Sequence, residues 1–441
     1  MKNSAFFKFS VMAILFFMFL TPTIFVPGFI GIRLEEIYLL FFALVVLFVR
    51  NENGWCFKIP LRVVVLTIFL PLLMISTLMG ELLSLPATLG DYSKIIWLIK
   101  AILLYLIFYN FTHSDGHERI SRIDFVLQNF IRFATISAVI CYQQYFDIFK
   151  LNSVYIPIVA PTQYVTLMPG YPTPRVVGML GNPNVQGYVL TLAIVSIIYF
   201  ILNKRKKISY LTLTVLFIAL FMTLSRGALV ALVVGSVYLF LMYKKPNTNL
   251  FITKTVVIVL LVIVFYIAYH LFLENETLYN AIFYRFELLE NATEDISFVA
   301  RYDGWRINWN YFKVSPFFGV GLLPRATDIF IGSDNEWLHF LRSFGIVGIF
   351  WLAIFLLTPI LLTKNKPFEI SNLNRFILSI LVLSFTYMIP AAVILSPITF
   401  PFLLVFLSFS DRTVYVFKHR LISQKTHNIA FKLSTKGVVN E

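Results

Sequence analysis

The sequence predicts an all-α polytopic membrane protein with about twelve transmembrane helices. Three observations predict this fold class: the composition, the spacing of apolar runs and the placement of cations. Hydrophobic residues make up 59% of the 441-residue chain and charged residues only 13%, whereas a soluble domain needs a more polar surface. We therefore expect residues 1–441 to form a single integral membrane domain.

The predicted helices follow from runs that are long and apolar enough to cross the hydrocarbon core of a bilayer, which takes about 20 residues. The runs lie at 7–26, 34–49, 61–80, 95–111, 124–146, 182–202, 208–224, 227–243, 250–272, 337–361, 373–393 and 397–416. The first run could be a signal peptide, but it is long and lacks a small-residue cleavage site. We expect it to remain as a membrane anchor.

Lysine and arginine divide unevenly between the two sides of this predicted bundle. If the N-terminus is cytoplasmic, every inner loop is cationic, and a basic cytoplasmic tail follows at 417–441. This agreement with the positive-inside rule predicts that both termini are cytoplasmic. The net charge of +14 is thereby explained by topology, so we expect no nucleic-acid partner.

The outer side of the bundle is predicted to carry two long segments. The first, 147–181, is rich in turn residues and ends in PRVVGMLGNPN. The second, 273–336, joins the ninth and tenth predicted helices and contains ETLYNAIFYRFELLE, whose apolar periodicity predicts amphipathic helices at the membrane interface.

Arginines lie on the outer side against the general cationic bias. They are Arg175, Arg226, Arg285, Arg301, Arg306 and Arg325. The planar guanidinium binds phosphate through two hydrogen bonds, so such a cluster suits a lipid-linked phosphate or pyrophosphate. The alternative is that each arginine extends to the lipid headgroups or pairs with a nearby carboxylate. Arg226 lies in a short turn and is expected to be buried at the outer mouth of the bundle.

Four motifs occur in order along the second half of the chain. They are R-x-x-G-x-x-G-N-P-N at 175–184, T-x-S-R-G at 223–227, R-x-x-x-W…S-P-F-F-G-V-G at 301–321 and D-N-x-x-L…F-G-I-V-G-I at 334–349. In this order and spacing they resemble the O-antigen ligase and Wzy-type polymerase superfamily. The resemblance covers roughly residues 160 to 350.

The resemblance implies an inverting glycosyltransferase on the outer face of the bacterial inner membrane, which uses an undecaprenyl-pyrophosphate-linked glycan as donor. Ligases of the family transfer the glycan to lipid A-core, and polymerases transfer it to another lipid-linked repeat unit of O-antigen, capsule or exopolysaccharide. Such enzymes are expected to need no metal or other cofactor. The implied partners are the lipid-linked glycan, the bilayer, a chain-length regulator and a flippase.

The motifs also imply site residues. The catalytic set is Arg226, Arg301 and Asp334, and the substrate-binding set is Arg175, Asn184, Arg306 and Asn335. Asp334 stands where ligases carry a histidine, which favours a polymerase. Asp334 could accept a proton from the attacking hydroxyl; alternatively Ser333, Asp334 or Asn335 caps the following helix. Glu336 and His339 are interpreted as neighbours on that helix.

Other charged residues suggest rival interpretations. The adjacent pair Glu35 and Glu36 could bind a metal, as in another class of lipid-sugar transferases, but solvation at the interface is the favoured interpretation. Lys100 and Arg132 lie in apolar runs and are expected to face the bundle interior. A lipid-linked oligosaccharide flippase is the rival of another class, but it predicts short loops on both sides, unlike this chain.

Overall fold

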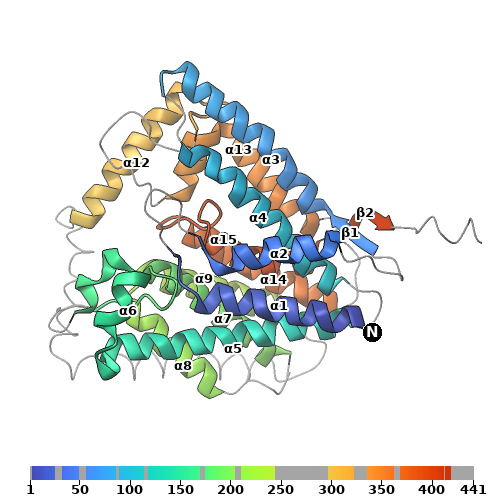
Figure 1. Cartoon of the computed structure of the whole chain (residues 1–441). Coiled ribbons are helices and arrows are strands. Elements are labelled where there is room, and N and C mark those ends of the chain that lie inside the picture. Colours follow the sequence, from blue (N-terminus) through green and yellow to red (C-terminus); the bar gives the residue numbers. More distant parts are fainter. Residues whose placement is uncertain are drawn as a thin grey trace, which may run out of the picture.

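The computed structural model describes residues 2–24, 32–48, 56–85, 89–113, 118–168, 174–203, 210–243, 296–321, 335–361, 368–411 and 413–418. This part of the chain is mostly helical (Figure 1). The helices are α1 (Lys2–Leu20), α2 (Leu34–Phe48), α3 (Leu61–Leu82), α4 (Leu89–Thr112), α5 (Glu118–Phe146), α6 (Asn152–Val159), α7 (Pro183–Leu202), α8 (Tyr210–Met222), α9 (Arg226–Met242), α12 (Ile296–Val314), α13 (Glu336–Leu361), α14 (Phe368–Tyr387) and α15 (Thr399–Leu407). Every predicted apolar run except 250–272 overlaps one of them, and that run lies outside the described residues.

Five segments of the described chain are long and apolar enough to cross a membrane. They are Leu61–Leu82, Lys94–Thr112, Glu118–Phe146, Pro183–Leu202 and Glu336–Leu357. Shorter apolar helices, α8 and α9 among them, pack beside these segments. The protein is thus a helical membrane protein, while the count of twelve helices and the sides of the two termini stay predictions.

Helix α7 forms the centre of the bundle. It packs against α5, α8 and α9, and also contacts α14 and α15. Its side chains are buried on every face of the helix. A helix that is apolar all round belongs in a protein core or in lipid, and the helices that contact α7 place it in the core. These contacts also fix the position of its first residues.

Figure 1 shows the two ends of the bundle clearly. The N-terminus of α1 and the strands β1 (Cys56–Pro60) and β2 (Thr413–Lys418) lie at one end, which we call the sheet end. Helices α6 and α12 lie at the opposite end, which we call the loop end. The predicted loop 147–181 thus contains α6 and short 3-10 turns, and the predicted loop 273–336 contains α12. The stretch ETLYNAIFYRFELLE lies outside the described residues.

A two-stranded sheet adds to the predicted helical fold, which is otherwise confirmed as mostly helical. Strands β1 and β2 pair antiparallel, with Cys56 opposite Lys418. The predicted run 397–416 is helical only through α15 and a 3-10 turn at Ser408–Ser410, and the tail predicted from 417 begins within β2. The alternation of β-branched and aromatic residues in TVYVFK favours a strand, and β1 supplies the partner that an isolated strand needs.

Arg62, at the start of α3, holds the sheet end together. Its guanidinium is completely buried and donates to the carbonyl oxygens of Phe355 at 2.9 Å, Leu356 at 3.0 Å and Leu407 at 2.8 Å. The carbonyl of Phe355 cannot accept the usual helical bond from the residue four positions on, because Pro359 has no amide N–H. Arg62 therefore satisfies backbone groups of α13 and α15 that could not face lipid.

The charge of Arg62 is balanced by Asp411. A carboxylate oxygen of Asp411 accepts from the backbone N–H of Arg62 at 3.0 Å and from the hydroxyl of Tyr105 at 2.8 Å. All three residues are buried. A buried charge is stable when it is paired and hydrogen-bonded in this way.

Lys100 and Arg132 differ, although both were expected inside. Lys100 is buried and pairs with Glu35 at 3.1 Å and Glu36 at 2.8 Å, which confirms the prediction. Glu35 also pairs with Arg33 at 2.6 Å and is buried, so its predicted solvation at the interface is wrong. Arg132 is exposed on α5, so its predicted inward placement is wrong.

Candidate functional site

The N-P-N motif builds the start of α7. The side-chain oxygen of Asn182 accepts from the backbone N–H groups of Asn184 at 2.8 Å and Val185 at 3.3 Å, and Pro183 occupies the first helical position. Asparagine is a favoured N-cap, and proline is tolerated where the helix needs no donor. The motif therefore fixes where α7 begins and where Asn184 stands.

Arg175 joins the first two motifs. Its Nη2 donates to the side-chain oxygen of Asn184 at 3.0 Å, and its Nε donates to the carbonyl oxygen of Thr223 at 3.2 Å. The backbone N–H of Val176 donates to the carbonyl of Met222 at 3.2 Å. Arg175 and Asn184 are only partly buried. Segments that lie far apart in sequence thus meet at one half-buried guanidinium.

The T-x-S-R-G motif forms the sharp turn between α8 and α9. Leu224 has a left-handed backbone with φ 50°, and the hydroxyl oxygen of Thr223 accepts from the N–H of Ser225 at 3.3 Å. Arg226 follows as the first residue of α9 and is partly buried, which is less than the sequence predicted. A Cβ at Gly227 would lie 2.5 Å from Pro390, so the glycine permits close packing.

Two tyrosines connect this region to the end of α14. The rings of Tyr188 and Tyr387 stack with their centroids 4.9 Å apart. Tyr387 donates to the carbonyl oxygen of Asn184 at 2.6 Å, and the hydroxyl of Tyr188 lies 2.8 Å from that of Ser384. The start of α7, the turn before α9 and the end of α14 are therefore one hydrogen-bonded unit.

The opening of α13 carries the fourth motif. The side-chain oxygen of Asn335 accepts from the N–H of Leu338 at 3.2 Å, so Asn335 caps this helix. Among the residues considered for capping, the geometry assigns the role to Asn335. Ser333 and Asp334 lie outside the described residues, so the proposed proton acceptor stays a prediction.

Glu336 is a site residue that the sequence interpretation passed over. It is completely buried, and its carboxylate accepts from the backbone N–H groups of Val393 and Ile394 at 2.7 Å and of Leu395 at 2.6 Å. Its own N–H donates to the carbonyl of Met388 at 2.9 Å. Three backbone donors around one carboxylate form a concave anion site. An acidic residue in the first turn of an apolar helix is the one signal that could have indicated it.

The loop after α14 links these parts. Its residues 388–395 hold Glu336 at the start of α13, and its Pro390 packs on Gly227 beside Arg226. We call residues 388–395 the bridging loop. The second and fourth motifs thus pack on one short segment that the sequence analysis did not single out.

The third and fourth motifs interlock through backbone hydrogen bonds. The N–H of Val320 donates to the carbonyl of Arg342 at 2.8 Å, and the N–H of Ile346 donates to that of Pro316 at 2.8 Å. Gly345 breaks α13 with φ 62°, and Gly319 has φ 72°. A Cβ on either glycine would collide with backbone atoms of the other segment. These glycines are therefore needed for the crossing, and α13 is a discontinuous helix.

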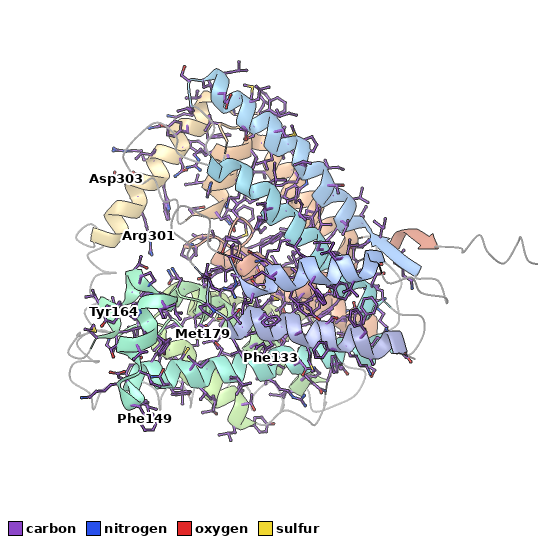
Figure 2. The ribbon with its side chains drawn as sticks, in the orientation of Figure 1. Phe133, Phe149, Tyr164, Met179, Arg301 and Asp303 are labelled. Atoms are coloured by element: carbon purple, nitrogen blue, oxygen red, sulfur yellow. The ribbon has the colours of Figure 1, made fainter. Side chains whose placement is uncertain are left out.

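Helix α12 places its two predicted arginines differently. Figure 2 shows Arg301 on the side of α12 that faces the rest of the molecule and Asp303 on the outer side. Arg301 is partly buried. Arg306 pairs with Asp303 at 3.4 Å, with side-chain exposures of 67% and 50%. An exposed salt bridge of this kind contributes little to stability. Substrate binding by Arg306 stays a prediction.

Metal-binding side chains do not gather within the described part of the chain. No group of three or more His, Cys, Asp or Glu residues occurs there that could hold a metal ion. The pair of Glu35 and Glu36, the rival metal signal, is instead neutralised by Lys100 and Arg33.

Comparison with known proteins gives one family match. Residues 211–356 match the model of the O-antigen ligase family. The matched segment contains Arg226, Arg301, Arg306 and Asn335, whereas Arg175 precedes it. The resemblance inferred from the motifs is confirmed over this segment. No curated protein matches the chain.

Proposed function

We propose, from a chain whose residues 211–356 match the O-antigen ligase family, that this protein polymerises undecaprenyl-pyrophosphate-linked oligosaccharide repeat units into O-antigen, capsule or exopolysaccharide. The enzyme works on the outer face of the bacterial plasma membrane. A hydroxyl of one repeat unit attacks the anomeric carbon of another, the bond to the pyrophosphate breaks with inversion, and undecaprenyl pyrophosphate leaves with the electron pair.

The placement of Arg175 carries the proposal. Its guanidinium is oriented by Asn184 and by the carbonyl of Thr223, yet the side chain is only partly buried. An arginine that serves structure alone tends to be fully enclosed by its acceptors, as Arg62 is. A guanidinium held in place and still accessible is suited to bind a pyrophosphate oxygen.

Arg226 and Arg301 are the further cations of the proposed site. Arg226 stands at the first residue of α9, where the helix dipole adds positive potential. Positive charge fixed before the reaction stabilises the charge that develops on the leaving group, and this can be worth about 3–4 kcal/mol per donor. Arginines can supply this stabilisation without a metal ion.

The acceptor hydroxyl is assigned to the start of α13. Asp334 precedes the capping residue Asn335, and we propose that Asp334 removes the proton from the attacking hydroxyl. The bridging loop ties this helix start to the turn that carries Arg226. This arrangement supports one site with its base just before α13 and its cations in the segment before α7, at the start of α9 and on α12.

An O-antigen ligase is the second candidate, favoured by the description of the matched family. It would use the same donor site and transfer the finished glycan to lipid A-core. Aspartate at position 334, in place of the ligase histidine, favours the polymerase. The two activities differ in the acceptor only.

A strain that lacks the gene separates the candidates. If the protein is a polymerase, its loss leaves single lipid-linked repeat units. If it is a ligase, its loss leaves long lipid-linked glycan that is not attached to lipid A-core. A gel of the extracted glycans distinguishes the two products. Restoration by the wild-type gene is the control. Repeat units that accumulate on the cytoplasmic face would instead indicate a flippase and contradict the proposal.

A further inference from the structure

Lys94 connects α4 to the bridging loop. It is the first residue of the part of α4 that is long and apolar enough to span a membrane, Lys94–Thr112. Its Nζ donates to the carbonyl oxygen of Leu395 at 3.3 Å, and its side chain is partly buried. Helix α4 precedes all four motifs and the matched segment 211–356. Lys94 therefore brings a cation from outside the matched segment to the loop that holds Glu336.

The backbone of Leu395 lies between Lys94 and Glu336. Its N–H donates to the carboxylate of Glu336 at 2.6 Å, and its carbonyl oxygen accepts from Lys94. The positive charge of Lys94 also stabilises the ionised carboxylate of Glu336. A buried carboxylate needs hydrogen bonds and an opposite charge to compensate for its lost hydration. Lys94 thus supports both the bridging loop and the carboxylate that the loop surrounds.

A second lysine of α4 anchors the chain just beyond this loop. Lys100 lies less than two turns further along the helix, and its Nζ donates to the carbonyl oxygen of Pro397 at 3.3 Å. Lys100 is itself fixed by its ion pairs with Glu35 and Glu36. Two contacts from one helix therefore fix the C-terminal side of the bridging loop, next to the backbone N–H groups that bind Glu336.

We propose that Lys94 is a positioning residue for glycan transfer, which acts through Leu395 and Glu336 on the start of α13. The inference rests on the proposed function, because the proposed base Asp334 lies two residues before Glu336. A shift of the bridging loop would move this helix start relative to the turn that carries Arg226. Misplacement of a reacting group by about 1 Å can lower a rate about 100-fold. Removal of Lys94 therefore acts on turnover and not on substrate binding.

The first test measures chain growth by the purified full-length protein with a lipid-linked repeat unit. We expect Lys94→Met to lower kcat about tenfold or more and to leave KM for the repeat unit near the wild-type value. Lys94→Arg keeps the donor and the charge, so it should restore most of the rate. Lys150→Met removes an exposed cation before α6 and is the matched control, for which we expect wild-type kinetics.

The second test measures thermal unfolding in detergent and needs no enzymatic activity. The Tm is recorded for wild type, Lys94→Met, Glu336→Gln and the double variant. Because Lys94 acts on Glu336, the two losses in Tm are expected to be less than additive in the double variant. Wild-type protein that extends no chains would refute the proposed polymerase, whereas the unfolding cycle would still test the link between Lys94 and Glu336.

Three outcomes would overturn the assignment. Additive losses in Tm would show that Lys94 does not act on Glu336. A raised KM with unchanged kcat would make Lys94 a residue that binds the substrate directly. Wild-type kinetics of Lys94→Met would show that the position of the bridging loop does not depend on this lysine.

Discussion

Arginines at the two ends of the bundle meet different environments. At the sheet end, Arg62 is fully buried and its guanidinium is enclosed by three backbone carbonyls. At the loop end, Arg175 is held by two acceptors and stays partly exposed. The difference teaches that burial separates a guanidinium enclosed by backbone acceptors from one that keeps an exposed surface, and we propose that a ligand binds to that surface.

The largest expected effect is that of Arg62→Ala. The substitution leaves three buried carbonyls without their donor, and each such group costs about 1–3 kcal/mol. It also removes the positive charge that balances the buried Asp411 carboxylate, although the backbone N–H of residue 62 can still donate to it. We expect the free energy of unfolding to fall by more than 3 kcal/mol and little protein to remain in the membrane. Membrane-fraction immunoblots and thermal unfolding in detergent check this. If the Arg62→Ala protein unfolds at the wild-type Tm, the hydrogen bonds that enclose the Arg62 guanidinium contribute nothing to stability.

A smaller loss is expected for Gly345→Ala. The residue has φ 62° and touches the backbone of the S-P-F-F-G-V-G segment, so a side chain costs strain of about 1–3 kcal/mol besides the collision. Unfolding of the variant in detergent measures the loss. Ile346→Ala is the matched control, because its side chain is exposed. If both variants unfold alike, the crossing of the two motifs is not tightly packed.

Glu336→Gln tests the contact between the bridging loop and the start of α13. Its expected effect on stability lies between those of Arg62→Ala and Arg175→Ala. Glutamine keeps one acceptor oxygen but turns an N–H group toward backbone donors, and we expect a loss of about 1–2 kcal/mol together with reduced polymer length. Glu336→Ala should be worse in both respects. A variant with normal stability and normal polymer would exclude a positioning role for Glu336.

The smallest effect on stability is expected for Arg175→Ala. Two hydrogen bonds from a half-exposed side chain contribute about 1 kcal/mol net, whereas a lost pyrophosphate contact lowers activity about 100-fold or more. Tm and polymer yield are measured side by side. Lys150→Ala, an exposed cation in the same outer loop, should change neither. A large drop in Tm for Arg175→Ala would make that residue structural, like Arg62.

The helices could be predicted because long apolar runs bounded by cations are the sequence signal of membrane-spanning helices. Strand β2 was missed because its apolar residues continue the run of α15, and only the pairing with β1, far away in the chain, makes a strand there. Glu336 was missed for the same reason, since its partners Val393 to Leu395 lie more than fifty residues further on. Lys100 and Arg132 looked alike in sequence, and only their neighbours distinguish a buried ion pair from a surface cation.

The motifs predicted segments that contact one another in the structure, but they did not predict the framework roles of several of their residues. Arg175 and Asn184 were predicted to lie at the site, and the structure joins them to the Thr223–Gly227 turn. The glycines of the third and fourth motifs are needed for packing, which only the contact between both segments reveals. Asn182 and Asn335 cap helices. Part of each motif therefore preserves the framework, and the arginines are the residues for which we propose a chemical role.

The central claim is that outer arginines hold the pyrophosphate of the donor, and purified protein with a lipid-linked repeat unit tests it most directly. Arg226→Ala and Arg301→Ala are compared with Lys313→Ala, an exposed cation on α12. The account predicts that both arginine variants lose chain growth while their Tm stays close to that of wild type, and that Lys313→Ala extends chains normally. Full-length polymer from both arginine variants would contradict it.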